Sequence, residues 1–167
     1  MGRNTKNSRR DRFLEEAPKD GIENSDIATR SSFNFSYFSP TNGGQTFDDW
    51  SKVAGSATLL SLCKKLVDYT GSPLSYWETQ RAGAGGLKVL SYYKQFPTGT
   101  VFKKPNSIPH DVRWGRFRLG NKVRLAGFSI PTQLDGQLDD KGRRLSSNIF
   151  YVVYLDKEHE FYPVEAH

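Results

Sequence analysis

The sequence WGRFRLGNKVRLAGF, residues 114–128, decides the fold. Apolar and polar side chains alternate on either side of Gly120 and Asn121, over residues 112–119 and 122–130. Gly-Asn is typical of a two-residue hairpin loop of the primed-turn type, because both residues tolerate a positive φ. The pattern therefore predicts an antiparallel β-hairpin in which side chains two positions apart share one face.

Three further stretches predict the other strands of the sheet. Residues 149–155, IFYVVYL, form a nearly continuous apolar run, which is typical of a central strand buried on both faces. Aromatic and polar side chains alternate from Ser32 to Tyr37, and residues 87–93 are rich in β-forming residue types. A polar insert, residues 132–148, separates the hairpin from the last strand.

Helical spacing of apolar residues lies between the first two expected strands. It runs from about residue 47 to 69, after Thr46 and Asp49, which are arranged like a capping box. A shorter helix is expected over residues 73–80. The Gly-rich run 81–86 lacks the Lys-Ser/Thr pair of a phosphate-binding P-loop, which favours a flexible connector. Together the elements predict an α+β fold, a small curved antiparallel sheet with an N-terminal helical pair.

Length and composition predict one domain with an aromatic core. The chain has 167 residues, about one domain by the usual ~100–200 residues. Only 36% of the residues are hydrophobic, but 11 Phe, 8 Tyr and 3 Trp supply large apolar surfaces. Residues 1–30 are polar and show no sustained apolar period, so we expect a flexible tail there. Residues 31–167 then form the single domain.

The cysteine content and the hydropathy pattern exclude several classes of protein. Cys63 is the one cysteine, so neither an internal disulfide framework nor a zinc cluster built on several thiols fits. No stretch approaches the ~18 apolar residues of a membrane span, and the first 30 residues lack the apolar region of a signal peptide. A cytoplasmic protein without a membrane partner is expected. The sequence contains no ligand motif for a metal ion. We expect neither a metal ion nor another cofactor.

The positive charge of the chain is concentrated around the hairpin. Lysine and arginine exceed aspartate and glutamate by 24 to 18, a net charge of +6. Residues 101–131 alone carry a net +6, because Asp111 is their one acidic residue. The basic residues of this segment are Lys103, Lys104, Arg113, Arg116, Arg118, Lys122 and Arg124. An excess of this kind predicts a polyanionic partner, although a solvated basic strand face remains the alternative.

The alternation of the hairpin predicts which of these side chains lie together. Trp114, Arg116 and Arg118 share one face, and Lys122 and Arg124 follow the same period across the turn. Cations that bind phosphates beside an indole ring that stacks on bases are what a single-stranded nucleic acid requires. Arginine suits this role because its planar fork holds a phosphate in two places. RNA binding is therefore expected here, with Arg113, Lys103 and Lys104 as further contacts.

A histidine and a tyrosine follow the last expected strand. His159 and Tyr162 lie in DKEHEFY, residues 156–162, where they reach the sheet edge that carries the arginines. An imidazole and a phenol are a suitable acid–base pair. A lone surface histidine is more often incidental, and this alternative stays open. His110 lies in a proline-flanked loop and is not a candidate.

The hairpin motif, followed by NIFYVVYLDKEHEFY (residues 148–162), resembles the RelE/HigB/ParE superfamily of bacterial toxins. The resemblance implies a small α/β fold and, for the ribonuclease branch, metal-independent cleavage of mRNA on the ribosome, inhibited by an antitoxin. It also implies that Arg118 and Arg124 hold the scissile phosphate and that His159 and Tyr162 act as acid, base or stacking groups. The gyrase-directed branch shares the scaffold without the nuclease residues.

The sequence therefore supports hypotheses of different classes. The first is a toxin-like endoribonuclease that cleaves mRNA, is associated with the ribosome and belongs to a toxin–antitoxin or mobile-element system. The second is a non-catalytic nucleic-acid-binding protein of a phage or mobile element that uses the same basic hairpin. The third is a protein-interaction module with an aromatic docking surface.

Overall fold

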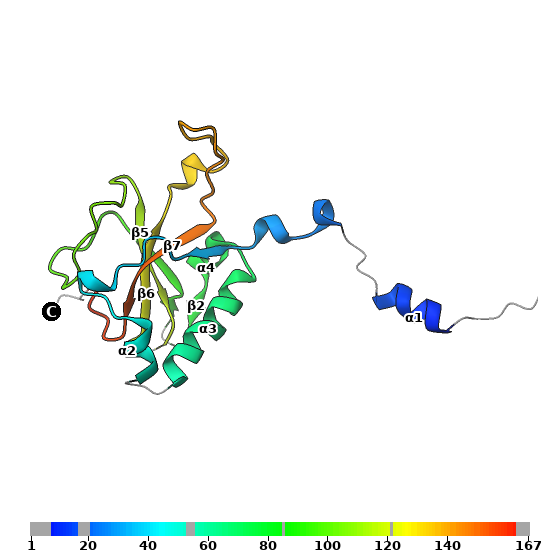
Figure 1. The fold of residues 1–167 in the computed structure, drawn as a ribbon, viewed down its shortest axis with the longest axis horizontal. Helices are drawn as coiled ribbons and strands as arrows, with labels where there is room; N and C mark the ends of the chain where they lie inside the picture. Colours follow the sequence, from blue (N-terminus) through cyan, green and yellow to red (C-terminus); the bar gives the residue numbers. More distant parts are fainter. Residues whose placement is uncertain (1–7, 17–20, 53–55, 85, 121, 163–167) are drawn as a thin grey trace, which may run out of the picture.

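The computed structural model describes residues 8–16, 21–52, 56–84, 86–120 and 122–162, and Figure 1 shows helices packed against a central sheet. The strands of the central sheet lie in the order β1-β7-β6-β5-β4. The elements of this body are β1 (Ser32–Asn34), η3 (Pro40–Asn42), α2 (Phe47–Lys52), α3 (Ser56–Thr70), α4 (Leu74–Thr79), β2 (Arg81–Ala82), β3 (Leu87–Lys88), β4 (Leu90–Tyr93), β5 (Arg113–Arg118), β6 (Arg124–Ser129), η4 (Thr132–Leu134) and β7 (Ile149–Asp156).

The expected α+β class is confirmed. The expected antiparallel pairing is confirmed from β7 through β6 and β5 to β4, but it is wrong for β1, which pairs in parallel with β7 at the edge and makes the sheet mixed. This edge strand is shorter than the alternation from Ser32 to Tyr37 predicted. The side-chain oxygen of Asn34 accepts a hydrogen bond from the Ser36 backbone N–H at 2.8 Å, and this local turn ends the strand.

The hairpin is confirmed in its position and in its pairing. Residues of β5 and β6 pair from Arg113 opposite Ser129 to Arg118 opposite Arg124. At the end of the hairpin next to the loop, the Leu119 N–H donates a hydrogen bond to the Val123 carbonyl at 3.0 Å. Asn121, one half of the predicted turn, lies outside the described residues. The alternation of faces follows the prediction, because residues two apart on β5 share one side of the sheet.

Helices α2, α3 and α4 cover one face of the sheet. The sequence predicted one helix over residues 47–69, and the structure has α2 and α3 there, with residues 53–55 outside the described part. The predicted capping box is confirmed, since Thr46 Oγ1 accepts from the Asp49 N–H at 3.0 Å and Asp49 accepts from the Thr46 N–H at 2.8 Å. Helix α4 lies within its predicted range. The Gly-rich run 81–86 was expected to be a flexible connector, but it begins with β2, which pairs with β3 in a small separate hairpin. The strand expected over residues 87–93 is divided into β3 and β4.

Two aromatic-rich clusters fill the interior, one on each face of the sheet, as the composition predicted. The helix-facing cluster includes Trp50, Tyr69, Phe117, Leu125 and Phe150, all fully or nearly fully buried. The cluster on the opposite face, which we call the loop-facing cluster, is covered by the segment 94–112. It includes Phe102, Trp114, Phe128, Tyr154 and Phe161. Strand β7 supplies residues to both clusters, so its prediction as a strand buried on both faces is confirmed.

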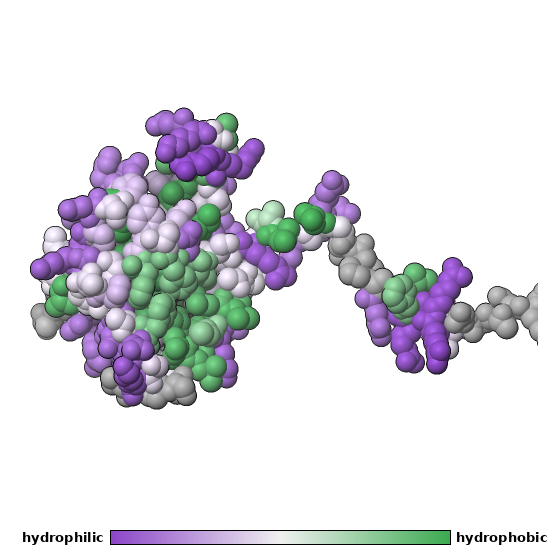
Figure 2. Space-filling model, viewed as in Figure 1, coloured by the Kyte–Doolittle hydropathy of each residue, from purple (hydrophilic) through white to green (hydrophobic). Residues whose placement is uncertain are grey.

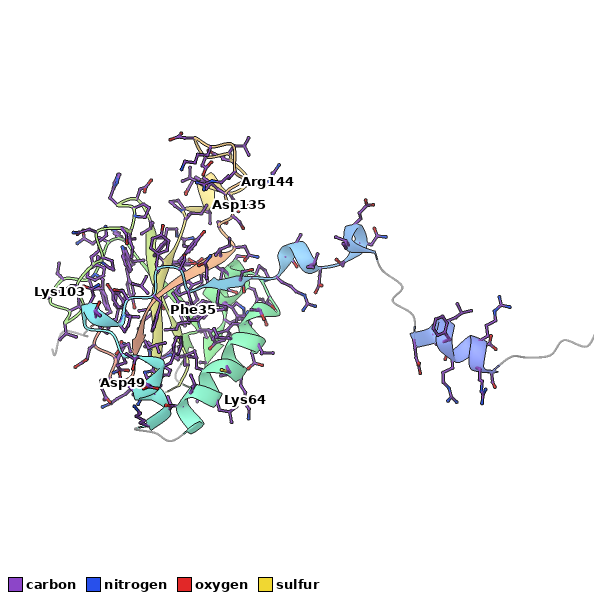
Figure 3. The ribbon with its side chains drawn as sticks, viewed as in Figure 1. Phe35, Asp49, Lys64, Lys103, Asp135 and Arg144 are labelled. Atoms are coloured by element: carbon purple, nitrogen blue, oxygen red, sulfur yellow. The ribbon has the colours of Figure 1, made fainter. Side chains whose placement is uncertain are left out.

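The polar insert and the N-terminal segment extend from this body. The insert forms η4 and a loop with a single bridge between Leu138 and Arg144, which stands at the top of Figures 1 and 3. In the N-terminal segment, expected as a flexible tail, the described residues form α1 (Ser8–Glu16), η1 (Ile22–Asn24) and η2 (Ile27–Thr29). No residue of α1 is buried, and Figure 1 shows α1 apart from the sheet. The Thr29 carbonyl attaches the end of the segment by accepting from Asn148 at 2.9 Å.

Figure 2 shows a hydrophobic area on the surface over α2 and α3. Phe47, Leu60 and Val67 are the large apolar side chains that these helices expose. Among the described residues, no helix is long and apolar enough to cross a membrane.

Candidate nucleic-acid interface

The pairing of β5 with β6 brings three arginines together at one end of the sheet. Arg118 lies directly opposite Arg124, and Arg116 lies opposite Ala126. All three project from the face that the helices leave uncovered, because Phe117 and Leu125, next to them along the strands, belong to the helix-facing cluster. We call Arg116, Arg118 and Arg124 the arginine cluster.

A β-bulge in β7 determines what faces this cluster. The pairing of β6 with β7 shifts between Ala126 and Gly127, so that Val153 is an extra residue on β7. Gly127 permits this close approach, because a Cβ atom there would lie 2.0 Å from the Tyr151 carbonyl oxygen. Beyond the bulge Asp156 lies opposite Arg124, on the face of the arginine cluster.

The turn after β7 positions His159. The buried carboxylate of Asp156 accepts hydrogen bonds from the backbone N–H groups of Glu160 and Phe161, each at 3.0 Å. Phe161 is fully buried in the loop-facing cluster and anchors the turn. His159 lies between these fixed points with a φ of 64°, a left-handed conformation that no other described non-glycine residue adopts. The turn directs the imidazole Nε2 toward Arg116, whose Nη1 donates a hydrogen bond to it.

Burial and mutual repulsion set the electrostatics of the cluster. The pKa of Arg124 is lowered to about 10, mainly by burial and then by the charges of Arg118 and Arg116. Burial and the nearby Arg116 also lower the pKa of Arg118. The pKa of His159 falls to about 4, because burial and then the three arginines disfavour the imidazolium. At neutral pH His159 is therefore uncharged, and Nε2 can accept a hydrogen bond or a proton.

The three arginines differ in how accessible they are. Arg124 is only 2% exposed, and its Nη1 donates to the carbonyls of Gly120 and Val123 at 2.9 and 2.8 Å. Arg124 therefore stabilises the hairpin turn through these hydrogen bonds and contributes positive charge to the arginine cluster from a buried position. Arg116 and Arg118 are half-buried and reach the surface. The Nε atoms of Arg116 and Arg124 are buried without a hydrogen-bond partner among the described residues.

Tyr162 continues the site on the side of Arg116. Its ring stacks on that of Tyr93, with centroids 4.2 Å apart and planes 6° from parallel. Burial raises the pKa of Tyr93, while the charge of Arg116 acts in the opposite direction. Tyr162 is 41% exposed, so part of its side chain is accessible to a ligand.

Two residues expected at the interface lie elsewhere. Trp114 is only 2% exposed and packs against Phe96, Phe128 and Phe161, so its indole cannot stack on a base. Arg113 projects from the opposite face, where it pairs with Glu78 at 3.1 Å and stacks over Tyr92. Trp114 lies on the predicted face, but segment 94–112 covers that face. Arg113 was wrongly expected to contact RNA, because period two places it on the face opposite Arg116.

The three predicted lysines lie around the arginine cluster rather than in it. Lys122 is exposed beside the hairpin turn. Lys103 is exposed in the segment that covers the loop-facing cluster (Figure 3), and its carbonyl accepts from the Tyr154 hydroxyl at 2.7 Å. Lys104 follows in the same segment and is half-buried. From these positions the lysines contribute positive charge at the periphery.

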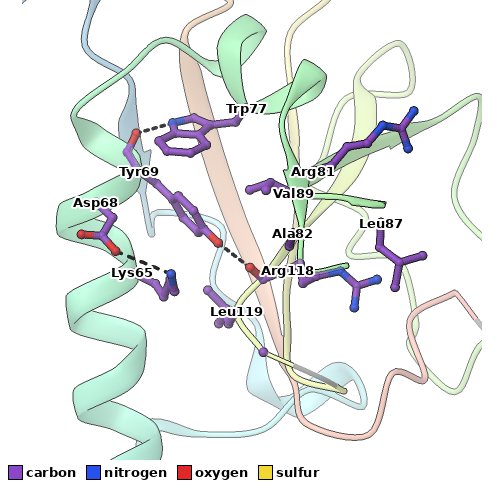
Figure 4. A pocket seen from close by; sticks show the side chains of 12 residues that line it. Lys65, Asp68, Tyr69, Trp77, Arg81, Ala82, Leu87, Val89, Arg118 and Leu119 are labelled. Carbon is purple, nitrogen blue, oxygen red and sulfur yellow. Dashed lines mark hydrogen bonds and ion pairs between the residues drawn. The ribbon is translucent and has the colours of Figure 1, made fainter. Parts of the chain in front are cut away.

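A cavity that sequence reasoning missed adjoins the cluster. It has a volume of about 620 Å³ and lies between α3, α4 and the β2–β3 hairpin (Figure 4). Arg118 is one of its lining residues and so belongs to both the cavity and the arginine cluster. No local sequence pattern predicts the cavity, because its walls come from α3, α4 and β3, which are separate parts of the chain.

The described residues contain no group of three or more His, Cys, Asp or Glu side chains that could hold a metal ion. Comparison with known proteins finds no family model, no curated protein and no solved structure that matches the chain.

Proposed function

We propose that the protein is an RNA-directed endoribonuclease whose arginine cluster binds a phosphodiester and whose His159 moves a proton. One observation carries the proposal: the neutral imidazole accepts a hydrogen bond from Arg116 inside a group of three mutually repelling arginines. A cation group of this kind beside an unprotonated base is suited to a substrate that gains negative charge as it reacts.

The charge balance supports an anionic ligand. Three arginines face one carboxylate, Asp156, which already accepts two backbone N–H groups. An anion that binds on this face reduces the repulsion between the guanidinium groups and accepts charge-assisted hydrogen bonds from them. A phosphate diester fits because arginine binds two of its oxygens at once.

The proposed reaction uses the RNA's own 2′-hydroxyl. Phosphate oxygens compete for Arg116 and release Nε2 of His159, which takes the proton of the 2′-hydroxyl as its oxygen attacks the adjacent phosphorus. The bond from phosphorus to the 5′-oxygen breaks, and this oxygen takes a proton from the exposed Tyr162. The products are a 2′,3′-cyclic phosphate and a 5′-hydroxyl. Arg116 and Arg118 neutralise the charge on the phosphorus-bound oxygens, with Arg124 behind them.

Cleavage of an end-labelled single-stranded RNA, alone and in a ribosome-containing extract, tests the proposal. His159→Ala should lower the cleavage rate by about 10²–10⁴-fold. His110→Ala is the matched control, because it removes an exposed imidazole from a loop outside the arginine cluster. Equal rates for wild type and both variants, with the fold checked by circular dichroism, would refute a catalytic role for His159.

Non-catalytic nucleic-acid binding is the second candidate, favoured by one observation. Arg116 occupies Nε2 of His159, and a pKa of about 4 makes the imidazole a weak base. In that case Arg118→Ala lowers the affinity for RNA and reduces its salt dependence by about 0.7 in the log–log slope. His159→Ala would then change neither binding nor the RNA. The ribosome as the setting, and an antitoxin as an inhibitor, are partners that the RelE-like motif suggests for the first candidate.

A further inference from the structure

The cavity beside Arg118 has the walls of a ligand site. Apolar side chains form most of its lining, and charged groups stand at its rim. Besides Arg118, the lining includes Lys65, Asp68, Tyr69, Trp77, Arg81 and Leu87. Its volume of about 620 Å³ lies within the ~300–1,000 Å³ typical of small-molecule pockets.

The aromatic walls are held in place before any ligand binds. The Trp77 indole N–H donates to the Tyr69 carbonyl at 2.7 Å, and the Tyr69 hydroxyl donates to the Arg118 carbonyl. The Tyr69 ring also stacks on the buried Phe117, with centroids 4.7 Å apart. Figure 4 shows both aromatic side chains between α3 and the strands, held by these hydrogen bonds. A site with fixed walls loses little entropy when it binds a rigid planar ring.

The rim is positively charged. The lining contains three basic side chains, those of Lys65, Arg81 and Arg118, and one carboxylate, that of Asp68. Lys65 lies 3.6 Å from this carboxylate. A ligand that combines a planar, largely apolar ring with an anionic group matches this lining. A nucleotide has both parts.

We propose that this cavity binds an unpaired nucleobase of the RNA whose phosphate lies on the arginine cluster. The inference rests on the proposed function, and Arg118 connects the two sites because it lines both. A base inside the cavity is neither paired nor stacked on its neighbours in the RNA, so the site selects single-stranded RNA. Trp77 is half-buried and is the aromatic wall that a base can reach, whereas Tyr69 is nearly fully buried and supports Trp77 from behind. Stacking on an aromatic side chain increases affinity by about 5- to 150-fold per base.

Two probes of equal charge separate the cavity from the arginine cluster. A fluorescein-labelled oligouridylate carries bases, whereas an abasic RNA of the same length presents only sugar and phosphate. Wild-type protein should bind the oligouridylate about 5- to 150-fold more tightly in fluorescence anisotropy. Leu87→Asp, at a wall residue that is 53% exposed, should reduce this preference to near one.

Val67→Asp is the matched control. It introduces the same charge at an apolar residue of α3 that is 73% exposed and does not line the cavity. It should keep the wild-type preference, while any general repulsion of RNA by the added charge affects both probes alike. Leu87→Ser replaces Leu87→Asp if circular dichroism shows that the charged variant does not fold.

The outcomes distinguish the two proposals. Equal wild-type affinity for both probes overturns the base site and leaves RNA binding by the arginine cluster intact. An equal loss of preference in Leu87→Asp and Val67→Asp also overturns it. Failure of the wild type to bind either probe overturns the proposed function and the base site together.

Discussion

Replacing Arg116 by glutamine tests the electrostatics of the site directly. The hydrogen bond from Arg116 to Nε2 of His159 joins the two side chains, and burial and then this arginine lead the causes that lower the pKa of His159 to about 4. Glutamine can still donate a hydrogen bond through its amide but carries no charge. Arg116→Gln therefore removes the charge and leaves the burial and the other two arginines in place.

The expected change in the pKa of His159 follows from these causes. A unit charge about 4 Å away opposes the imidazolium by about 1 kcal/mol in water and about 4 kcal/mol at an effective dielectric constant of about 20. At about 1.4 kcal/mol per pH unit, this corresponds to a change in pKa of about 0.7 to 3. The total lowering, from 6.5 to about 4, has burial as its largest cause, so Arg116 accounts for less than half of it. We therefore expect Arg116→Gln to raise the pKa of His159 by about one pH unit.

The same substitution changes how stability depends on pH. Because the pKa of His159 is lower in the folded chain than its ordinary value of 6.5, the unfolded chain binds more protons between pH 6.5 and about 4. Stability therefore falls as the pH decreases through this window. Arg116→Gln raises the lower end of the window, so less stability is lost on acidification.

An NMR titration of the His159 ring protons, assigned with His159→Ala, measures the change. Arg113→Gln is the matched control, because Arg113 lies on the opposite face of the sheet and pairs with Glu78. A titration midpoint that is the same in wild type and Arg116→Gln would refute the electrostatic reasoning. So would an equal rise in the Arg113→Gln variant.

Three further outcomes are expected. Gly127→Ala should destabilise the fold by more than ~3 kcal/mol, because its Cβ would lie 2.0 Å from the Tyr151 carbonyl oxygen; a small loss in urea unfolding would contradict the bulge. Asp156→Asn should cost about 1–3 kcal/mol and displace the His159 resonances, because one of two acceptors for backbone N–H groups becomes a donor; unchanged spectra would contradict this. A chain without residues 1–20 should keep its melting temperature, because no residue of α1 is buried; a large decrease in thermal melting would show that this segment packs on the domain.

The sequence predicted the elements whose patterns are local. The alternation around Gly120 located the hairpin, and the apolar run of residues 149–155 located β7. The hairpin and β7 are both recognised from the face of the sheet that each residue occupies, and the spacing of apolar residues along a strand indicates this face directly. The helix over residues 47–69 was predicted with its cap, but the pattern did not separate α2 from α3.

The same patterns could not show which face of the sheet is covered. Trp114, on the arginine face, was expected to contact bases, but segment 94–112 buries it beside Phe102 and Ile108. That segment contains Pro97 and Pro105 and has no periodicity, so nothing in its sequence indicated that it folds over the sheet. The accessible part of the face is therefore limited to the end of β5 that carries Arg116 and Arg118.

The position of His159 depends on a departure from period two. Strict alternation from Tyr151 would place Leu155 on the arginine face and direct Asp156 toward the helix-facing cluster. The bulge at Val153 reverses this, so that Leu155 joins that cluster and Asp156 lies opposite Arg124.

Only from this side can the Asp156 carboxylate hold the turn that places His159 against Arg116. The sequence did contain an indication of the bulge. A glycine inside a strand pattern, as at Gly127, marks a bulge or a close backbone approach. Because the acid–base candidate reaches the arginines only through this irregularity, the geometry of the site depends on the absence of a side chain at Gly127 as much as on the charged residues themselves.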